Sequence, residues 1–306
     1  MTGLPHIRAE DAAHLMSWPA LVDALQEGHR GPEPQITDQF LTSGDRTVLS
    51  RAAWIDGLGV GVKTVTVFPE NPGQGRPTVQ GAMLVFDPVT GTPRATIDNG
   101  LITYWKTAAD SVLGARFLAR SGATRLLIIG AGTVARSLIE AYPAVLPGLE
   151  HIAVWNRTRA NASALASETG VRVADNLPDA VGAADIVATC TLSQTPVLEG
   201  RWLSRGTHVD LIGAFTATMR EADDEALRRA RIFVDSRATT LHHIGELKDP
   251  LERGVIQEED VLADYRDLAA GAGRRLGTDD ITLCKNGGGA HLDLMTADVI
   301  LRAVGL

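Results

Sequence analysis

The stretch LLIIGAGTVARSL, residues 126–138, decides the fold class of this chain. Its apolar run, its glycine pair and the helical pattern that follows predict a strand, a tight turn and a helix. Gly130 permits the turn, Gly132 lets a pyrophosphate approach the backbone, and Ala135 allows the helix to pack closely on the strand. Because N–H groups at a helix N-terminus attract phosphate, a dinucleotide site is favoured over a plain structural turn. The expected cofactor-binding residues of this loop are Gly130, Ala131, Gly132, Thr133, Val134 and Ala135.

Strands and helices alternate downstream of this loop. Apolar segments at residues 151–157, 184–191 and 207–214 predict further strands, separated by helical patterns. Repeated β–α units imply a doubly wound parallel sheet with right-handed crossovers. Since ligands bind beyond the carboxyl ends of such strands, we expect Thr191 and Gly213 to contact the cofactor.

The residues after the second strand indicate which cofactor is preferred. A site that selects NAD usually places Asp or Glu about 20 residues beyond the glycine loop, where it binds the ribose hydroxyls. This chain has Asn156, Arg157, Thr158 and Arg159 there. No carboxylate is present there to repel a 2′-phosphate, and the two guanidinium groups of Arg157 and Arg159 could bind one. We therefore expect these four residues to bind the cofactor and NADP(H) to be favoured over NAD(H), the alternative being that the arginines are solvated residues at a helix start.

The remaining segments have a different pattern of apolar and polar residues. Residues 9–31 predict one or two helices, and residues 47–98 alternate between apolar and polar positions with Pro and Gly turns, as in a mixed sheet. Residues 102–120 predict a further helix. The last segment, residues 281–306, predicts a strand, a glycine loop that includes Gly288 as a cofactor contact, and a closing helix.

The composition fits an ordinary α/β protein and argues against several classes of partner. The 306 residues predict about two domains at ~150 residues each. The net charge is −8 and no long block of Lys or Arg is present, so neither nucleic acid nor a membrane is an expected partner. Cys190 and Cys284 lie in apolar segments, which predicts buried thiols and a cytoplasmic protein without a secretory signal. The eight histidines show no ligand spacing, so no metal site is expected.

Further motifs follow one another along the chain. Residues 63–98, KTVTVFPENPGQGRPTVQGAMLVFDPVTGTPRATID, contain a lysine, a Pro-x-Asn turn, a PT pair and a D-x-x-TG turn. ITYWKTAADS (102–111) and ITLCKNGGGAHLD (281–293) are similar to the motifs T-x-x-RTAA-x-S and TLFKSVG-x-A-x-x-D. Together with GAGTVARS, WNRT, IGA, FVDS and GEL in the same order, they resemble the ornithine cyclodeaminase/mu-crystallin family over most of the chain.

The resemblance implies an architecture of two domains. Residues 1–115, completed by the C-terminal helix 288–306, would form an α+β domain with a mixed sheet for substrate binding and dimerisation. Residues 116–287 would form the Rossmann-type α/β domain that binds the nicotinamide cofactor. A homodimer is the expected assembly.

The resemblance also implies which residues meet the substrate. Lys63 matches the family lysine that approaches the substrate carboxylate or imine, and Lys106 stands where the family has a carboxylate-binding arginine. We expect both to be catalytic. Lysine keeps the charge but loses the bidentate fork, and Asp110 at i+4 can neutralise it. The other expected pocket residues are Arg51, Asp110, Phe215 and Asn71.

Two further positions depart from the family pattern. Ile36 lies near the place of another substrate arginine, for which Arg46 or Arg51 could substitute. Phe215 stands where cyclodeaminases have a proton-handling aspartate. A phenylalanine moves no proton, whereas hydride transfer needs mainly orientation and a dry site. The resemblance therefore favours an NAD(P)H-dependent reductase of a small imine, or of a 2-oxo acid plus amine. Ornithine cyclodeamination to proline and ammonia, or a weakly catalytic NADPH-binding protein, are the alternatives.

Overall fold

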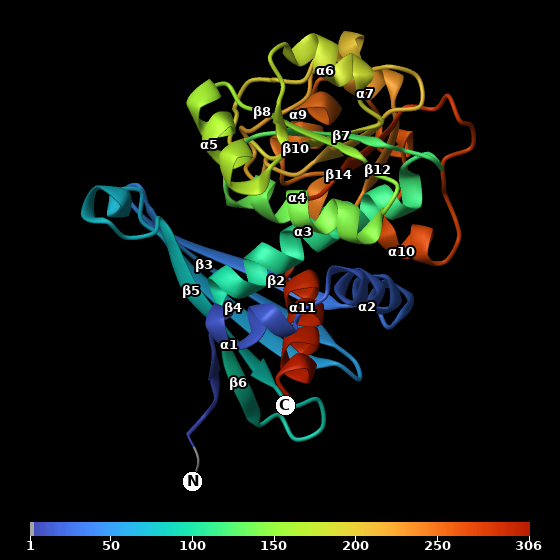
Figure 1. Cartoon of the computed structure of the whole chain (residues 1–306). Coiled ribbons are helices and arrows are strands. Elements are labelled where there is room, and N and C mark those ends of the chain that lie inside the picture. Colours follow the sequence, from blue (N-terminus) through green and yellow to red (C-terminus); the bar gives the residue numbers. More distant parts are fainter. Residues whose placement is uncertain (1–2) are drawn as a thin grey trace. The chain divides into compact units, whose positions relative to one another are not determined.

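The computed structural model describes residues 3–306 and divides the chain into two compact units (Figure 1). One unit comprises residues 1–106 and 289–306, and the other comprises residues 107–288. The boundary lies inside the long helix α3 (Asn99–Leu118), upstream of the boundary expected at residue 115. A helix that runs through a boundary has no loop or change of composition there, so the sequence does not mark the position.

The unit of residues 107–288 is built on one parallel sheet, which confirms the predicted doubly wound α/β class. Its strand order is β13-β12-β14-β11-β10-β7-β8-β9, and all neighbours are parallel. The chain moves outward from β7 first to β8 and then, on the other side, to β10, so the strand order reverses at β7. The strands are β7 (Arg125–Ile129), β8 (His151–Trp155), β9 (Arg172–Val173), β10 (Ile186–Thr189), β11 (His208–Leu211), β12 (Arg231–Val234), β13 (Val261–Ala263) and β14 (Thr282–Lys285).

The helices of this unit follow the strands in the order that βαβ units require. The predicted helix after the glycine loop is α4 (Thr133–Val145), and α5 (Arg159–Thr169) follows β8. The others are α6 (Leu177–Ala183), α7 (Asp224–Arg229), α8 (Arg237–Thr240), α9 (Gly245–Glu252), α10 (Tyr265–Ala269) and the 3₁₀ turns η3 (Gly200–Trp202) and η4 (Glu258–Asp260). Fully buried Leu127, Val187 and Val209 lie on the parallel strands of its core.

The other unit contains a six-stranded mixed sheet, also as predicted. The order is β1-β6-β5-β4-β3-β2, with β1 and β6 parallel and the remaining pairs antiparallel. The strands are β1 (His6–Ile7), β2 (Gln35–Ser43), β3 (Arg46–Ile55), β4 (Gly59–Val67), β5 (Val79–Phe86) and β6 (Pro93–Asp98). The sequence did not predict β2, because this edge strand is exposed at nearly every position and lacks an apolar alternation.

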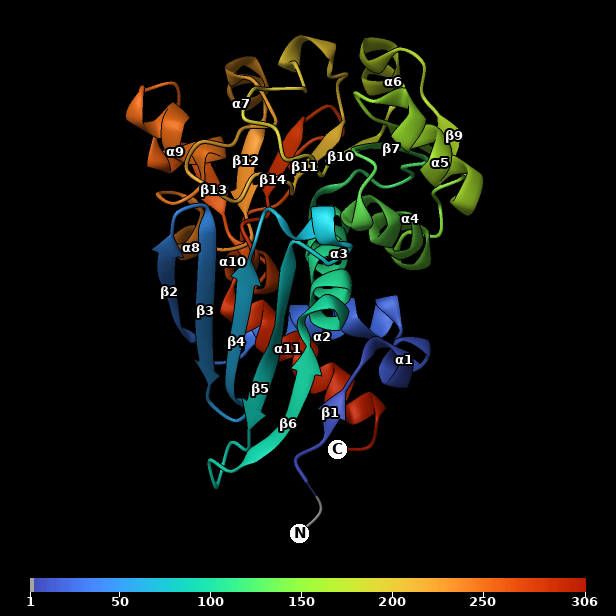
Figure 2. The ribbon, with the colours of Figure 1, turned by 90° about the vertical axis from the view of Figure 1, so that its left-hand side faces the viewer.

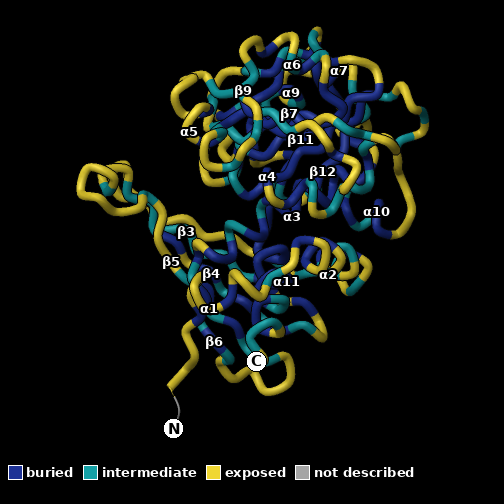
Figure 3. Tube along the Cα trace, in the orientation of Figure 1, coloured by how far each residue is buried: buried dark blue, intermediate teal, exposed yellow. Residues whose placement is uncertain are grey.

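One face of this sheet is covered by helices, and Figure 2 shows the opposite face without a helix in front of it. The covering helices include α2 (Trp18–Arg30) and α11 (Ala290–Ala303), and the short elements are α1 (Ala9–Ala12), η1 (Ala13–Leu15) and η2 (Asn71–Gln74). A Cβ at Gly28 would lie 2.5 Å from Met295 Sδ, so α2 and α11 pack closely at this glycine. In Figure 3 the trace of α11 is mostly buried, while the loop between β4 and β5 is exposed.

Candidate active site

Two cations lie side by side on the helix-covered face of the mixed sheet. Arg51 of β3 and Lys63 of β4 are register partners, and Asp38 of β2 is the partner of Arg51 on its other side. Arg51 Nε donates to Asp38 Oδ1 at 3.1 Å. Lys63 is buried, in the same alternating row of β4 as buried Val65. The pleat of the strands therefore directs both cations toward the helices.

Asp293 of α11 lies above these cations. Lys63 Nζ donates to Asp293 Oδ1 at 2.7 Å, and Arg51 Nη1 lies 3.9 Å from Asp293 Oδ2. The carboxylate has no exposed area. Burial alone would raise the pKa of Asp293, but Lys63, Lys106 and Arg51 outweigh it and hold that pKa below its usual value. Asp293 is therefore ionised at neutral pH.

Lys106 of α3 adds a third cation to this group. It is 8% exposed, and its charge acts on both Lys63 and Asp293. Burial lowers the pKa of Lys63, Asp293 opposes this, and Lys106 and Arg51 add to the lowering. We call Arg51, Lys63, Lys106 and Asp293 the cation cluster. Its surplus of positive charge is suited to a small carboxylate.

Two histidines border the cation cluster. The rings of His29 on α2 and His291 on α11 meet edge to face, with centroids 5.7 Å apart and planes at 87°. His29 Nδ1 lies 2.7 Å from the Leu25 carbonyl oxygen. Burial, followed by the charges of His29 and Lys106, lowers the pKa of His291 to about 3, so this imidazole is neutral at physiological pH.

The other expected pocket residues have different surroundings. Asn71 Nδ2 donates to the Pro77 carbonyl at 3.0 Å, within its own exposed loop. Arg46 pairs with Glu70, which leaves Arg51 as the arginine of the cluster. Ile36 lies in β2 as a half-buried side chain. Asp110, which is buried, and Phe215, which is 63% exposed after β11, belong to the other unit.

The glycine loop has the geometry that a dinucleotide requires. Gly130 has φ +129°, and a Cβ there would lie 2.7 Å from Cys190 Sγ, so the turn accepts only glycine. A Cβ at Gly132 would meet no atom within 4 Å, which leaves the backbone open to a ligand. Gly132 is the N-cap of α4, and Ala135 in the first turn of this helix is fully buried. Ala131, Thr133 and Val134 complete the loop, with Thr133 exposed at the helix start.

The four residues after β8 lie together at the start of α5. Thr158 is the N-cap position of α5, and Asn156 Nδ2 donates to the Thr158 carbonyl at 2.9 Å. Arg159 pairs with Asp175 at 2.5 Å, and both side chains are mostly exposed. Arg157 is exposed as well. Both guanidinium groups are therefore accessible beside a helix N-terminus.

Glu221 joins the loops that follow β10 and β11. Its carboxylate accepts from Thr191 N at 2.7 Å, from Thr191 Oγ1 at 2.8 Å, from Gly213 N at 2.6 Å and from Ala214 N at 3.2 Å. A Cβ at Gly213 would lie 2.0 Å from the Thr191 carbonyl oxygen, so this contact requires glycine. Buried Glu246 accepts from Glu221 N at 2.7 Å, and burial followed by the Glu221 charge raises the pKa of Glu246 to about 7. Both carboxylate oxygens of Glu221 are therefore used in hydrogen bonds that hold these two loops together.

The glycine loop after β14 is also held by a carboxylate. Asp235 Oδ2 accepts from Gly288 N at 2.5 Å, and Gly288 has φ +71°. Nearby, Lys285 Nζ donates to the carbonyl oxygens of Leu211 at 2.9 Å and Asn286 at 3.0 Å. Gly288 therefore lies in a fixed backbone turn.

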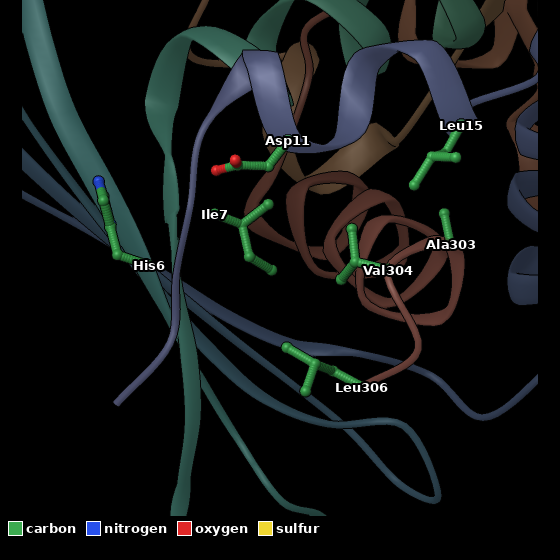
Figure 4. Close-up of a pocket in the computed structure, with 7 residues that line it drawn as sticks. All are labelled: His6, Ile7, Asp11, Leu15, Ala303, Val304 and Leu306. Carbon is green, nitrogen blue, oxygen red and sulfur yellow. The ribbon is translucent and has the colours of Figure 1, made fainter. Parts of the chain in front are cut away.

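A surface hollow of about 500 Å³ lies in the unit of the mixed sheet, beside the end of α11 (Figure 4). Its lining residues are His6, Ile7, Asp11, Leu15, Ala303, Val304 and Leu306. The polar side chains are already engaged: His6 lies 3.2 Å from Asp98, and Asp11 accepts from Arg8 N at 2.9 Å. This hollow therefore lacks the charged groups of the cation cluster.

Three other features bear on the class of site. No helix within residues 3–306 is long and apolar enough to cross a membrane. In the same residues, no three or more His, Cys, Asp or Glu side chains converge as metal ligands. Both cysteines are free; Cys284 is buried, and Cys190 is partly buried as a residue, although burial of its thiol raises the pKa of that thiol. The partial exposure of Cys190 comes from its place beside the open glycine loop, where its Sγ points inward to the Ile129 carbonyl.

Asp293 and the two histidines were missing from the residues predicted from sequence. The A-x-x-D motif that contains Asp293 was visible, but its contact with Lys63 joins positions 230 residues apart. His291 falls at a variable position of that motif. Only the return of α11 to the sheet reveals either residue as part of the site.

Comparisons with known proteins agree with this geometry. The sequence model of the ornithine cyclodeaminase/mu-crystallin family matches residues 26–304. A Δ(1)-pyrroline-2-carboxylate reductase of Paracoccus denitrificans (strain Pd 1222) is 54% identical over 300 residues, covering 96% of this chain and 95% of that protein.

Two solved structures are similar over almost the whole chain. Thermococcus litoralis Δ(1)-pyrroline-2-carboxylate reductase in complex with NADH and L-proline has a TM-score of 0.88 and 25% identity, covering 98% of this chain and 97% of that one. An archaeal alanine dehydrogenase dimer with bound NAD has a TM-score of 0.89 and 28% identity, covering 98% and 95%. This chain belongs to the ornithine cyclodeaminase/mu-crystallin family.

Proposed function

We propose that this protein is an NAD(P)H-dependent reductase of a small cyclic ketimine that bears a carboxylate, such as Δ(1)-pyrroline-2-carboxylate. The observation that carries the proposal is the cation cluster, in which three buried or half-buried cations surround one carboxylate. The 54% identical relative is named for reduction of this compound, and the Thermococcus litoralis structure contains NADH and L-proline.

The glycine loop fits the nicotinamide cofactor that the family uses. Space at Gly132, the α4 N-terminus and the packed Ala135 are suited to a pyrophosphate. When bound, NAD(P)H would supply the hydride for the imine carbon. We further propose that Gly130 to Ala135, Asn156 to Arg159, Thr191, Gly213 and Gly288 line the cofactor, and that residues 107–288 form the cofactor domain.

The cation cluster would bind and orient the substrate. Lys63 and Lys106 are placed to hold the carboxylate, and Arg51 adds a forked donor beside them. When hydride adds to the carbon of C=N, the π electron pair moves to nitrogen, and a neutral imine then needs one proton. Lys63 is suited to give it because burial lowers its pKa.

Phe215 favours reduction over ornithine cyclodeamination. Its exposed ring follows β11, where it can form an apolar wall, and it exchanges no proton. The two other acids considered for that role are unsuitable: Glu221 is fully buried and accepts from loop N–H groups, and Asp110 is buried in α3. An enzyme that lacks a proton handler at this place would leave ornithine unchanged.

We also propose NADP(H) as the preferred cofactor and a homodimer as the assembly. Exposed Arg157 and Arg159 support the first, since they can bind a 2′-phosphate where no acid follows β8. The helix-free face of the mixed sheet supports the second, with Trp54 53% and Leu41 61% exposed, as does the archaeal relative solved as a dimer. Two free cysteines support a cytoplasmic location.

The function is tested by two assays on the purified protein. With NADPH present, Δ(1)-pyrroline-2-carboxylate should cause cofactor oxidation and form proline. Ornithine with NAD⁺ or NADP⁺ should release no ammonia. Ammonia release at ~1 s⁻¹ or more would establish a cyclodeaminase instead, and cofactor binding without turnover of any cyclic ketimine would leave only a binding protein.

A further inference from the structure

We propose that Asp293 Oδ2 accepts a hydrogen bond from the substrate nitrogen, so that the site selects α-imino acids in their N-protonated form over 2-oxo acids. This inference rests on the proposed function and concerns the same site. It assigns the recognition of nitrogen to α11, which belongs to the unit of the mixed sheet, whereas Phe215 belongs to the unit of residues 107–288.

The two oxygens of Asp293 differ in their surroundings. Oδ1 accepts from Lys63 Nζ at 2.7 Å. Oδ2 is buried and accepts a hydrogen bond from no residue in the described part of the chain. Arg51 Nη1, at 3.9 Å, contributes charge but is too distant for a hydrogen bond. One charged acceptor of the cation cluster is therefore open.

An open acceptor of this kind is unusual in a folded protein. Buried polar groups nearly always find a partner, because a buried group without one costs free energy. The cost is larger for an ionised oxygen, and Asp293 stays ionised because its pKa is held low. His291 Nδ1 is also buried and without a hydrogen-bond partner among residues 3–306. Two unpartnered atoms on one turn of α11 indicate a polar ligand at this place.

An α-imino acid has the matching arrangement of charges. Its carboxylate and its nitrogen are attached to the same carbon, so an anion and an N–H donor lie side by side. The cluster presents the complement: cationic Lys63 and Lys106 beside the open anionic oxygen of Asp293. The protonated imine already has its nitrogen proton, so hydride addition yields the neutral amine without a further acid. The amine product keeps an N–H for the same contact.

A 2-oxo acid lacks that donor. Its carbonyl oxygen would face Asp293 Oδ2, and two acceptors would then be buried against each other. The imine is thus favoured by one charge-assisted hydrogen bond and the oxo acid is disfavoured by one repulsion. Such sites reject analogues that cannot pair with their buried polar groups.

A pair of isosteric probes tests the proposal on the wild-type protein. Pyrrole-2-carboxylate and furan-2-carboxylate have the same shape, but the first has N–H where the second has an acceptor oxygen. Calorimetric titration in the presence of saturating NADP⁺ should give at least ~10-fold tighter binding of the pyrrole, as expected for a hydrogen bond to a charged group. Equal affinity, or tighter binding of the furan, would overturn the proposal.

The variant Asp293→Asn tests the residue itself. Its amide oxygen can still accept from Lys63, which turns the NH₂ group toward the ligand, so the pyrrole preference should fall to about one or reverse. The matched control is Asp298→Asn on the same helix, where Asp298 pairs with Arg302 away from the cluster. The control should keep the wild-type ratio. An unchanged ratio in a folded Asp293→Asn protein, as judged by circular dichroism, would also contradict the proposal.

These measurements are independent of turnover. Loss of the probe preference with intact reductase activity would refute the role of Asp293 and keep the proposed function. A clear preference for the pyrrole without any imine reduction would support the role of Asp293 and refute the proposed reductase function. Furan and pyrrole titrations thus separate the two ideas.

Discussion

Arg51 and Lys63 stand directly opposite each other on adjacent antiparallel strands, two like charges on one face of a sheet. Such a pair is destabilising by itself. Asp293 offsets it from above, and Asp38 pairs with Arg51 from the edge strand. The site therefore keeps one positive charge more than its acids neutralise, counting Lys106 with the other two cations. That surplus is the basis of the predictions on substrate and stability.

Removing Lys63 should cost both activity and stability. Lys63→Met leaves Asp293 buried without its hydrogen-bond donor, which we expect to lower the free energy of unfolding by ~3–5 kcal/mol. The double variant Lys63→Met/Asp293→Leu should recover part of this loss, because no uncompensated charge remains. Urea unfolding of the three proteins measures the coupling. Strictly additive effects would mean that the two side chains do not interact.

Acid should destabilise the protein through His291. Its folded pKa of about 3 lies below the usual value near 6.5, so the unfolded chain binds the extra proton first. The stability from this group is complete above about pH 6.5 and is lost as the pH falls toward 3. The groups that act on it are His29 of α2, Lys106 of α3, Arg51 of β3 and Asp293 of its own helix.

The measurement compares wild type with His291→Gln between pH 4 and 7. The slope of the unfolding free energy against pH should be shallower in the variant. The difference should correspond to at most one proton taken up on unfolding. A matched substitution of exposed His243→Gln should leave the slope unchanged. Parallel curves for wild type and His291→Gln would contradict the prediction.

NADPH should bind more tightly than NADH. Replacing both Arg157 and Arg159 by Ala should weaken NADPH binding by ~1–3 kcal/mol and leave NADH nearly unchanged, because only NADPH has the 2′-phosphate. Arg205→Ala, which removes an exposed arginine paired with Asp279, is the control. Titration calorimetry decides the matter. A wild-type preference for NADH would show that Asn156 and its neighbours do not select the phosphate.

Phe215→Asp should not create a cyclodeaminase by itself. It should slow imine reduction if Phe215 forms the proposed apolar wall, because a charge there would admit water to the nicotinamide. Restoring cyclodeamination would also require Lys106→Arg, since a loosely held carboxylate leaves Cα misaligned. Ammonia release from ornithine and NADPH oxidation with a cyclic imine are measured on all variants. Ammonia from the wild type would show that another residue handles the proton.

The helix-free face of the mixed sheet should be the dimer interface. Trp54→Glu places a charge on this face and should yield a monomer in light scattering at micromolar concentration. Leu276→Glu, at a 74% exposed position of the other unit, should remain dimeric. A monomeric wild-type protein would rule out the assembly.

The sequence predicted features that depend on short stretches. The glycine loop, the parallel strands and the lysine at 63 all have local patterns, and the structure shows the two predicted sheets. It did not predict β2, whose residues are exposed, or the boundary inside α3, where one helix continues. Asp293 and His291 meet their partners only through tertiary folding, so no spacing in the sequence indicates their contacts.

The unit of the mixed sheet consists of two segments that are far apart in the sequence, and this determines the order in which the two units can fold during synthesis. Residues 107–288 form one uninterrupted unit, which can fold as soon as the ribosome has released it. The mixed sheet is synthesised earlier but must wait for residues 290–303, because α11 supplies the only carboxylate that touches Lys63 among the residues described. A nascent chain therefore holds Lys63 without its carboxylate partner until α11 has been made, whereas Arg51 already has Asp38. The cation cluster is therefore completed only after the whole of residues 107–288 has been synthesised.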